Sequence, residues 1–330
     1  MTAGIVAALA LGVATLAPET PPLEAALAEA RALVDAGRPE EAAARLGALD
    51  RSPRVRHLLG VARYHAGDLD GAIEVFEGLP DELPLGSSER REAVQVMGLT
   101  LFELGRLADA IPLLEQTLEW AGDQQELNQV LGRAYIQARR PDDARGAWAR
   151  VFGVAPGSAA AHLLTAQMMV RLEFEEDAEG ELRQAIAKDP TLPNAHYLLG
   201  QLAIFRARFE DGEALTRREI ELNPANAMAY YQLGDAFVRQ SRWEEAIEVL
   251  QRSLWINPYY SGPYILLGRA YDRKGQPATA EGMLRRAIQY DPNNPQAHYL
   301  LGRLLQRTGR EEEAGRELEL AERLRQQAVR

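Results

Sequence analysis

The sequence contains no cysteine among its 330 residues. The chain can therefore form no disulfide, thiolate nucleophile or iron–sulfur cluster, and it lacks the ligands of the usual structural zinc sites. This absence does not indicate a cellular compartment, because a helical array needs no disulfide.

Positive charge is also scarce relative to negative charge. The chain has 37 Lys and Arg against 48 Asp and Glu, which gives a formal net charge of −11. General nucleic-acid binding depends on Lys and Arg that neutralise phosphates, so we expect no nucleic-acid partner. A local basic groove is still compatible with this balance.

Sequence motifs of catalytic chemistry are missing as well. The chain has no glycine-rich phosphate loop, no nucleophile elbow and no His-Glu-x-x-His zinc motif. Acidic clusters such as Glu175-Glu176-Asp177 stand at the starts of predicted helices. Their negative charge suits the helix dipole there, so we do not interpret them as paired catalytic carboxylates. We therefore expect no enzyme activity, no catalytic residue, no cofactor and no metal site.

Only one uncharged stretch is long enough to suggest contact with a membrane. Residues Ala3 to Ala17 carry no charge, and Pro18 to Pro22 then interrupt the run. This pattern is typical of a secretory signal, so residues 1–21 are interpreted as a signal peptide or an N-terminal membrane anchor. We then expect an exported or periplasmic protein that contacts a membrane only through this segment. No Lys or Arg precedes the run, so a cytoplasmic protein with an Ala-rich N-terminal helix packed on the first repeat stays open.

A period of 34 residues dominates the rest of the chain. A small residue recurs with that spacing at Gly98, Gly132, Ala166, Gly200, Gly234, Gly268 and Gly302. A second small residue follows each of them twelve positions later, at Ala110, Ala144, Ala178, Gly212, Ala246, Ala280 and Ala314. Small residues belong where two antiparallel helix backbones approach closely, and large apolar residues fill the space around them. Each unit is therefore predicted to be a helix, a turn and a second helix.

Proline ends several units at the same interval, as in Asp189-Pro190, Asn223-Pro224, Asn257-Pro258 and Asp291-Pro292. Proline disfavours helix in the preceding residue and cannot continue the hydrogen-bond ladder. A 34-residue helix pair with Leu-Gly, Ala, a large apolar residue and Pro at these positions resembles the tetratricopeptide repeat family.

This resemblance implies an all-α fold, a right-handed superhelical solenoid of antiparallel helix pairs. We count about nine repeats in residues 22–330, with degenerate first repeats in 22–90 and regular repeats in 91–330. Gly60 and Gly98 are 38 residues apart rather than 34, and we place the four inserted residues in a loop at 78–88.

Two further features need interpretation. His162, His196 and His298 occupy the same repeat position, which predicts packing rather than metal binding. One repeat, residues 193–226, has Gly212, Thr216 and Glu219 where other repeats have Ala, Leu and Ala or Ser. That departure indicates either ordinary sequence drift or a hinge.

In the tetratricopeptide family the first helices of successive repeats line a concave groove. The resemblance therefore implies groove positions at Tyr197, Gln201, Tyr231, Arg239, Arg269, Arg273, Tyr299, Arg303 and Arg307. Because Arg binds carboxylates in a bidentate manner, an acidic protein or peptide partner is expected. The family's carboxylate clamp needs Lys and Asn, and the matching positions here hold neither.

The sequence thus predicts a non-catalytic protein–protein interaction scaffold in an exported or envelope assembly. Two alternatives stay open. One is a self-associating structural module that forms a homo-oligomer, and the other is an accessory subunit of a separately encoded enzyme.

Overall fold

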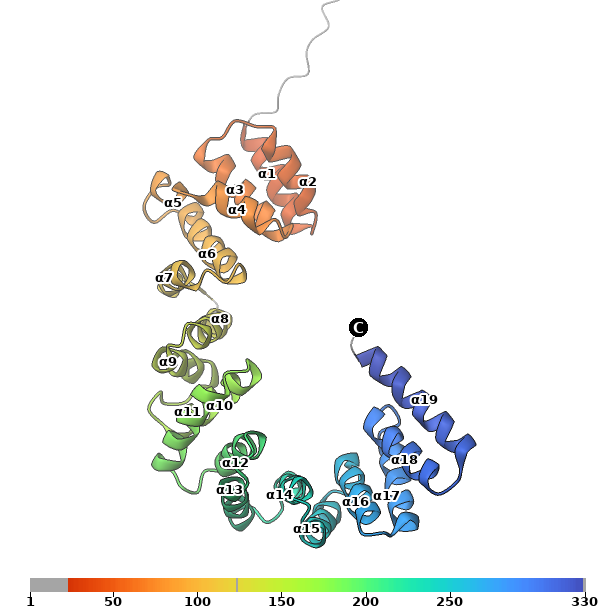
Figure 1. Ribbon diagram of the computed structural model, residues 1–330. Helices are drawn as coiled ribbons and strands as arrows, with labels where there is room; N and C mark the ends of the chain where they lie inside the picture. Colours follow the sequence, from red (N-terminus) through yellow and green to blue (C-terminus); the bar gives the residue numbers. More distant parts are fainter. Residues whose placement is uncertain (1–22, 123, 329–330) are drawn as a thin grey trace, which may run out of the picture. The chain divides into compact units, whose positions relative to one another are not determined.

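A computed structural model describes residues 23–122 and 124–328 of the chain. All regular secondary structure in these residues is helical, with no strand among them (Figure 1), so the predicted all-α class is confirmed. The interpretation of residues 1–21 as a signal or anchor lies outside the described residues. In the part that the structure describes, no helix has the length and apolar character needed to cross a bilayer.

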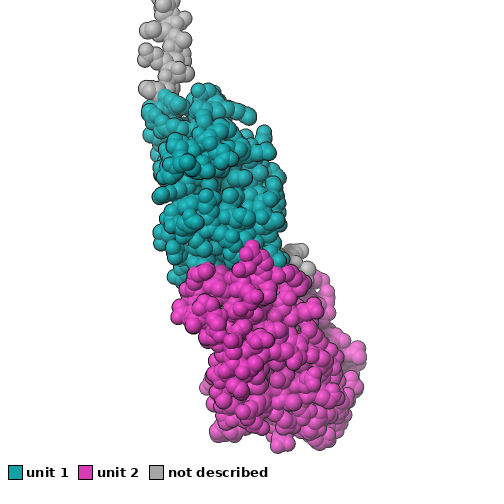
Figure 2. All heavy atoms as spheres, turned by 90° about the vertical axis from the view of Figure 1, so that its left-hand side faces the viewer, with its two compact units in different colours: residues 1–138 teal, residues 139–330 magenta. Residues whose placement is uncertain are grey.

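The chain divides into two compact units, residues 1–138 and 139–330, which Figure 2 colours separately. The helices of the first unit are α1 (Leu23–Asp35), α2 (Pro39–Gly47), α3 (Pro53–His65), α4 (Leu69–Phe76), α5 (Leu79–Glu82), α6 (Ser88–Glu103), α7 (Leu107–Thr117) and α8 (Gln124–Gln137). Those of the second unit are α9 (Pro141–Phe152), α10 (Ala159–Arg171), α11 (Glu175–Lys188), α12 (Ala195–Phe205), α13 (Phe209–Leu222), α14 (Ala227–Arg239), α15 (Trp243–Ile256), α16 (Ser261–Arg273), α17 (Pro277–Tyr290), α18 (Pro295–Arg307) and α19 (Glu311–Ala328).

Inside each unit the helices pack as consecutive pairs. In the second unit α12 packs on α13, α14 on α15, α16 on α17, and α18 on α19. The first helices of neighbouring repeats also contact one another, α12 with α14, α14 with α16, and α16 with α18. They form one side of the array in Figure 1, and the second helices α13, α15 and α17 form the other. Because the first helices approach each other so closely, their side is the inner side of the curved unit.

The two small positions of each repeat mark the close contact between its helices. A Cβ atom on Gly234 would lie 2.5 Å from the Leu250 side chain, which is shorter than real contacts allow. Ala246, the second small residue of this repeat, has no exposed surface. Gly268 and Gly302 are similarly close to Leu284 and Leu318. The predicted role of the small residues is therefore confirmed.

The turn between the two helices of a repeat has a left-handed residue. Glycine occupies it at Gly105, Gly275 and Gly309, where glycine tolerates a positive φ without a steric penalty. The same turn position holds Arg139, Glu173, Ala207 and Ser241, whose φ angles are 56°, 65°, 58° and 60°. Four repeats therefore accept a strained non-glycine residue, at a cost on the order of 1 kcal/mol each.

The insertion at 78–88 is not a simple loop as expected. Its first half forms the one-turn helix α5, and Leu79 and Leu83 are buried in a core that includes Phe76 and Ala93. Apolar residues at these two positions explain the difference, since they remove surface from water when they pack under the turn. Leu85 in the second half is 87% exposed.

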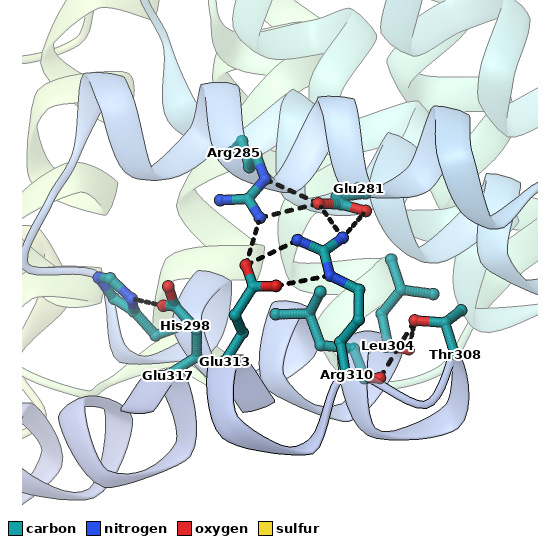
Figure 3. Close-up of polar contacts among 9 residues, drawn as sticks. Glu281, Arg285, His298, Leu304, Thr308, Arg310, Glu313 and Glu317 are labelled. Atoms are coloured by element: carbon teal, nitrogen blue, oxygen red, sulfur yellow. Dashed lines mark hydrogen bonds and ion pairs between the residues drawn. The ribbon is translucent and has the colours of Figure 1, made fainter. Parts of the chain in front are cut away.

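A recurrent ion-pair motif joins successive second helices. Figure 3 shows one copy, in which Arg310 Nη1 lies 2.8 Å from Glu281 of α17 and Arg310 Nη2 lies 2.6 Å from Glu313 of α19. Glu281 also binds Arg285, one turn later on its own helix. Two further copies have the same arrangement. Arg242, Glu213 and Arg217 join α13 to α15, and Arg208, Glu179 and Arg183 join α11 to α13.

This ion-pair ladder is interrupted between α15 and α17. The positions that match Glu281, Arg285 and Arg310 hold Ile247, Gln251 and Gln276, and the position that matches Glu313 holds Thr279. Ile247 packs instead against the buried cluster around Leu250 and Leu266, and Gln251 Nε2 donates to Tyr271 Oη at 3.0 Å. All four charged members of the motif are therefore replaced by uncharged residues at this junction.

Candidate functional site

The predicted groove residues of the second unit line two separate cavities. The first, called here the cationic cavity, has a volume of about 500 Å³ and is formed mainly by α16 and α18. Its lining includes Arg269, Arg273, Tyr299, Arg303 and Arg307 together with Asp272. Five of the nine residues proposed from the sequence are thus brought together at one place.

The cationic cavity carries more positive charge than its own carboxylate balances. Arg307 forms an ion pair with Asp272. Arg269, Arg273 and Arg303 are exposed, and none has an ion-pair partner among the described residues. Three uncompensated guanidinium groups therefore meet in a cavity of a chain that is acidic as a whole.

Helix α19 places a cation over the Tyr299 ring, a contact that the sequence analysis did not identify. The Arg325 guanidinium lies 5.7 Å from the centroid of the Tyr299 ring, within the range of a cation–π interaction. Tyr299 is still 41% exposed. The ring thus offers flat apolar area beside the arginines, and Arg325 reaches it because α19 runs antiparallel to α18.

The second, called here the aromatic cavity, has a volume of about 320 Å³. It is formed by α12, α14 and the residue before α16, and it contains the other four predicted residues, Tyr197, Gln201, Tyr231 and Arg239. Arg239 Nε lies 2.7 Å from Asp235 Oδ2, so its charge is balanced within the cavity. Arg239 therefore belongs to a different and electrically neutral environment from the arginines of α16 and α18.

Among the aromatic-cavity residues that were absent from the predicted site, three add aromatic or exposed apolar surface. Phe205 and Met228 are 70% and 40% exposed, and Tyr260 packs edge-to-face on Tyr231 with ring centroids 5.0 Å apart. Tyr260 precedes its helix, so no rule about groove positions on first helices could have selected it. Burial raises the pKa of Tyr197, Tyr231 and Tyr260 further above physiological pH, so all three phenols are neutral there.

A buried polar network supports the aromatic cavity. Gln232 Nε2 donates to Thr216 Oγ1 at 2.8 Å and to the Tyr197 carbonyl at 3.2 Å. Glu219, which is fully buried, accepts from the backbone N–H of Asn194 at 3.1 Å and from that of Tyr197 at 3.4 Å. The unusual residues of the 193–226 repeat thus replace apolar packing with hydrogen bonds that fix the start of α12. Whether this repeat bends as a hinge stays a prediction.

The three histidines at one repeat position are buried, as predicted for packing residues. His162 Nδ1 lies 2.7 Å from Glu181, and His298 Nδ1 lies 2.6 Å from Glu317 (Figure 3). His196 Nε2 lies 3.0 Å from the carbonyl of Pro190. Each ring therefore ties its helix to a neighbouring segment. Across residues 23–122 and 124–328 no group of three or more His, Asp or Glu side chains is placed to hold a metal ion.

Paired helices, a close inner row of first helices and a groove on that row define a helical repeat solenoid. Two family profiles, both described as tetratricopeptide repeat, match the chain, one at residues 27–87 and 197–261 and the other at 101–168 and 273–330. The chain belongs to the tetratricopeptide repeat family. Membership makes it a protein-interaction scaffold, a class that is generally non-catalytic.

Several solved structures are similar to about half of the chain. A structure described as the crystal structure of MamA is 22% identical, with a TM-score of 0.45, and the match covers 50% of this chain and 96% of that one. MamA from Desulfovibrio magneticus RS-1, from residue 41 to its end, is 21% identical with a TM-score of 0.47, covering 51% and 96%. YrrB, described as a tetratricopeptide repeat protein with an unusual peptide-binding site, is 17% identical with a TM-score of 0.45, covering 56% and 93%. No curated protein matches the sequence.

Proposed function

We propose that this scaffold binds an acidic peptide segment of a partner protein in the cationic cavity. The observation that carries the proposal is the convergence of Arg269, Arg273 and Arg303, which have no ion-pair partner among the described residues. Charged groups of one sign are costly to hold together unless an opposite charge arrives. A carboxylate-rich segment would supply that charge.

The geometry suits carboxylates better than a general anion surface. Arg269 and Arg273 are one helical turn apart on α16, and Arg303 lies on the adjacent α18, so neighbouring guanidinium groups face the same cavity. Each planar guanidinium can bind a carboxylate through two parallel N–H donors. The exposed ring of Tyr299 adds apolar area for the backbone or side chains between the acidic residues.

A selection from a random library of displayed peptides, with the full chain immobilised, tests this proposal. We expect the recovered peptides to be enriched in clustered Asp and Glu. The triple variant Arg269→Glu, Arg273→Glu, Arg303→Glu should lose this enrichment, because the cavity then repels carboxylates. Its melting temperature should change little, since exposed charges contribute little to stability.

The matched control reverses three other exposed arginines, Arg252, Arg286 and Arg316, which lie on the second helices α15, α17 and α19. It changes the net charge equally and should leave the acidic enrichment intact. Binding of a selected peptide to the wild-type chain should also weaken as salt rises. If the cavity variant retained the acidic preference, the groove would be the wrong surface, and the exposed half of the 78–88 insertion would be examined next.

A further inference from the structure

We propose that the aromatic cavity is a second subsite of the same peptide site and takes an aromatic side chain five or six residues from the acidic cluster. This inference rests on the proposed function, because it assigns a further part of the same ligand. It makes the ligand bipartite, with a charged part and an uncharged aromatic part held at a fixed spacing.

The lining of the aromatic cavity selects an uncharged aromatic group. Tyr197, Tyr231 and Tyr260 present rings, and Phe205 and Met228 expose apolar surface beside them. Aromatic rings prefer edge-to-face or offset partners at centroid distances of about 4.5–7 Å. The Tyr231–Tyr260 pair already has such a geometry, and a ligand ring would extend it. Sulfur–aromatic contact with Met228 would add to the attraction.

The charges of the cavity give an acidic side chain no advantage there. Asp235 and Arg239 neutralise each other at 2.7 Å. The phenols are neutral at physiological pH, because the ordinary pKa of tyrosine is about 10 and burial raises it further. The neighbouring cationic cavity, in contrast, retains three unpaired guanidinium groups. One bound segment would therefore place its carboxylates on α16 and α18 and an uncharged side chain on α12 and α14.

The fold fixes the distance between the two subsites. Both cavities lie in the second unit, and α12, α14, α16 and α18 contact each other in succession. Packed helices lie about 8–10 Å apart, so the middle of the α12–α14 cavity and the middle of the α16–α18 cavity differ by about 16–20 Å. An extended peptide advances about 3.3 Å per residue. The spacing therefore corresponds to about five or six residues.

The same peptide selection tests this inference if the recovered sequences are aligned on their acidic cluster. We expect an aromatic residue at five or six positions from that cluster, on one side of it. The variant Phe205→Ser, Met228→Ser should lose the aromatic preference and keep the acidic one, because both residues are exposed and their loss leaves the packing intact. The control Trp255→Ser, Tyr259→Ser removes two aromatic residues that are 73% and 74% exposed and lie outside both cavities, and it should keep both preferences.

A binding titration by fluorescence anisotropy with one selected peptide gives the size of the effect. Replacing its aromatic residue by Ala should raise Kd about tenfold or more, as expected when a buried aromatic anchor is truncated. Inserting three Gly between the two parts should have a similar effect.

The outcomes separate the two proposals. Acidic peptides that show no aromatic preference at a constant spacing would overturn the bipartite site and leave the acidic-peptide proposal standing. Peptides without acidic enrichment would overturn both. An aromatic preference that survived the Phe205 and Met228 variant would place the aromatic subsite elsewhere and also overturn this inference.

Discussion

Individual small residues set how closely the two helices of a repeat can pack. The Leu250 side chain fills the space over Gly234, and Ala246 is fully buried beside it. No room is left there for a longer side chain, and no water is available to solvate a charge. Glu248, two residues further along α15, is exposed. Position 248 should therefore accept a change of charge or length that position 246 does not, although the two are close in sequence.

We predict that Ala246→Asp lowers the free energy of unfolding by about 3 kcal/mol or more, because it combines overpacking with an unpaired buried carboxylate. The variant Glu248→Lys should change it by less than about 0.5 kcal/mol. Thermal unfolding followed by circular dichroism compares the two. Equal melting temperatures would contradict the packing register.

Several residues of the candidate site could be predicted from sequence and others could not. The 34-residue period and the family resemblance selected Arg269, Arg273 and Arg303, because groove positions repeat with the helices. The period could not show that Arg239 is neutralised by Asp235, since that depends on side-chain conformation. Nor could it select Tyr260, which lies outside any first helix and enters the cavity only through packing on Tyr231.

At the scale of helices, the turns and the helix starts depart most from the sequence pattern. Glycine signalled the left-handed turn in three regular repeats, but Ala207 and Ser241 adopt the same conformation without that signal. Tertiary packing of the two flanking helices therefore overrides local preference. Likewise, Glu219 replaces the Ala or Ser of other repeats, and its burial makes sense only once its hydrogen bonds to the start of α12 are seen.

We predict that Glu219→Ala destabilises the protein by about 2 kcal/mol, because the backbone donors of Asn194 and Tyr197 and the side-chain amide of Asn226 would lose a buried acceptor. Glu221→Ala is the matched control, since Glu221 is exposed and its ion pair with Arg218 lies at the surface. Its effect should be close to zero. Chemical denaturation of both variants provides the comparison. An unchanged free energy of unfolding for Glu219→Ala would contradict the prediction and show that water replaces the lost acceptor without cost.

At the scale of the whole molecule, stability is distributed over many similar interfaces. Each repeat contacts mainly its neighbours, so stability is approximately a sum of repeat and interface terms. The sequence period predicted this architecture because every repeat carries the same close-contact residues. It did not predict the division into units after residue 138. This division falls between α8 and α9, which are the two helices of a single sequence repeat.

We further propose that residues 1–21 direct the protein out of the cytoplasm. The charge-free run from Ala3 to Ala17 motivates this proposal. In a bacterial host the full chain should be recovered in the envelope fraction, and a chain that begins at Pro22 should remain in the cytoplasm. Cell fractionation followed by immunoblotting measures the distribution. Recovery of both chains from the cytoplasm would favour a packed N-terminal helix instead.

The interruption of the ion-pair ladder lies between the repeat of α14 and α15, which contributes to the aromatic cavity, and the repeat of α16 and α17, which contributes to the cationic cavity. Ladder members join α11 to α13, α13 to α15, and α17 to α19, and salt screens such pairs. At the interruption, α15 packs on α16 through an apolar cluster that includes Leu250 and Leu266. The polar contacts there are the Gln251–Tyr271 hydrogen bond and the exposed pair of Lys274 and Glu244. Apolar contacts are not weakened by ionic strength. If the proposed two-part ligand binds, a rise in salt should therefore lower the affinity for its acidic part, but the length of ligand that fits the two cavities should stay the same.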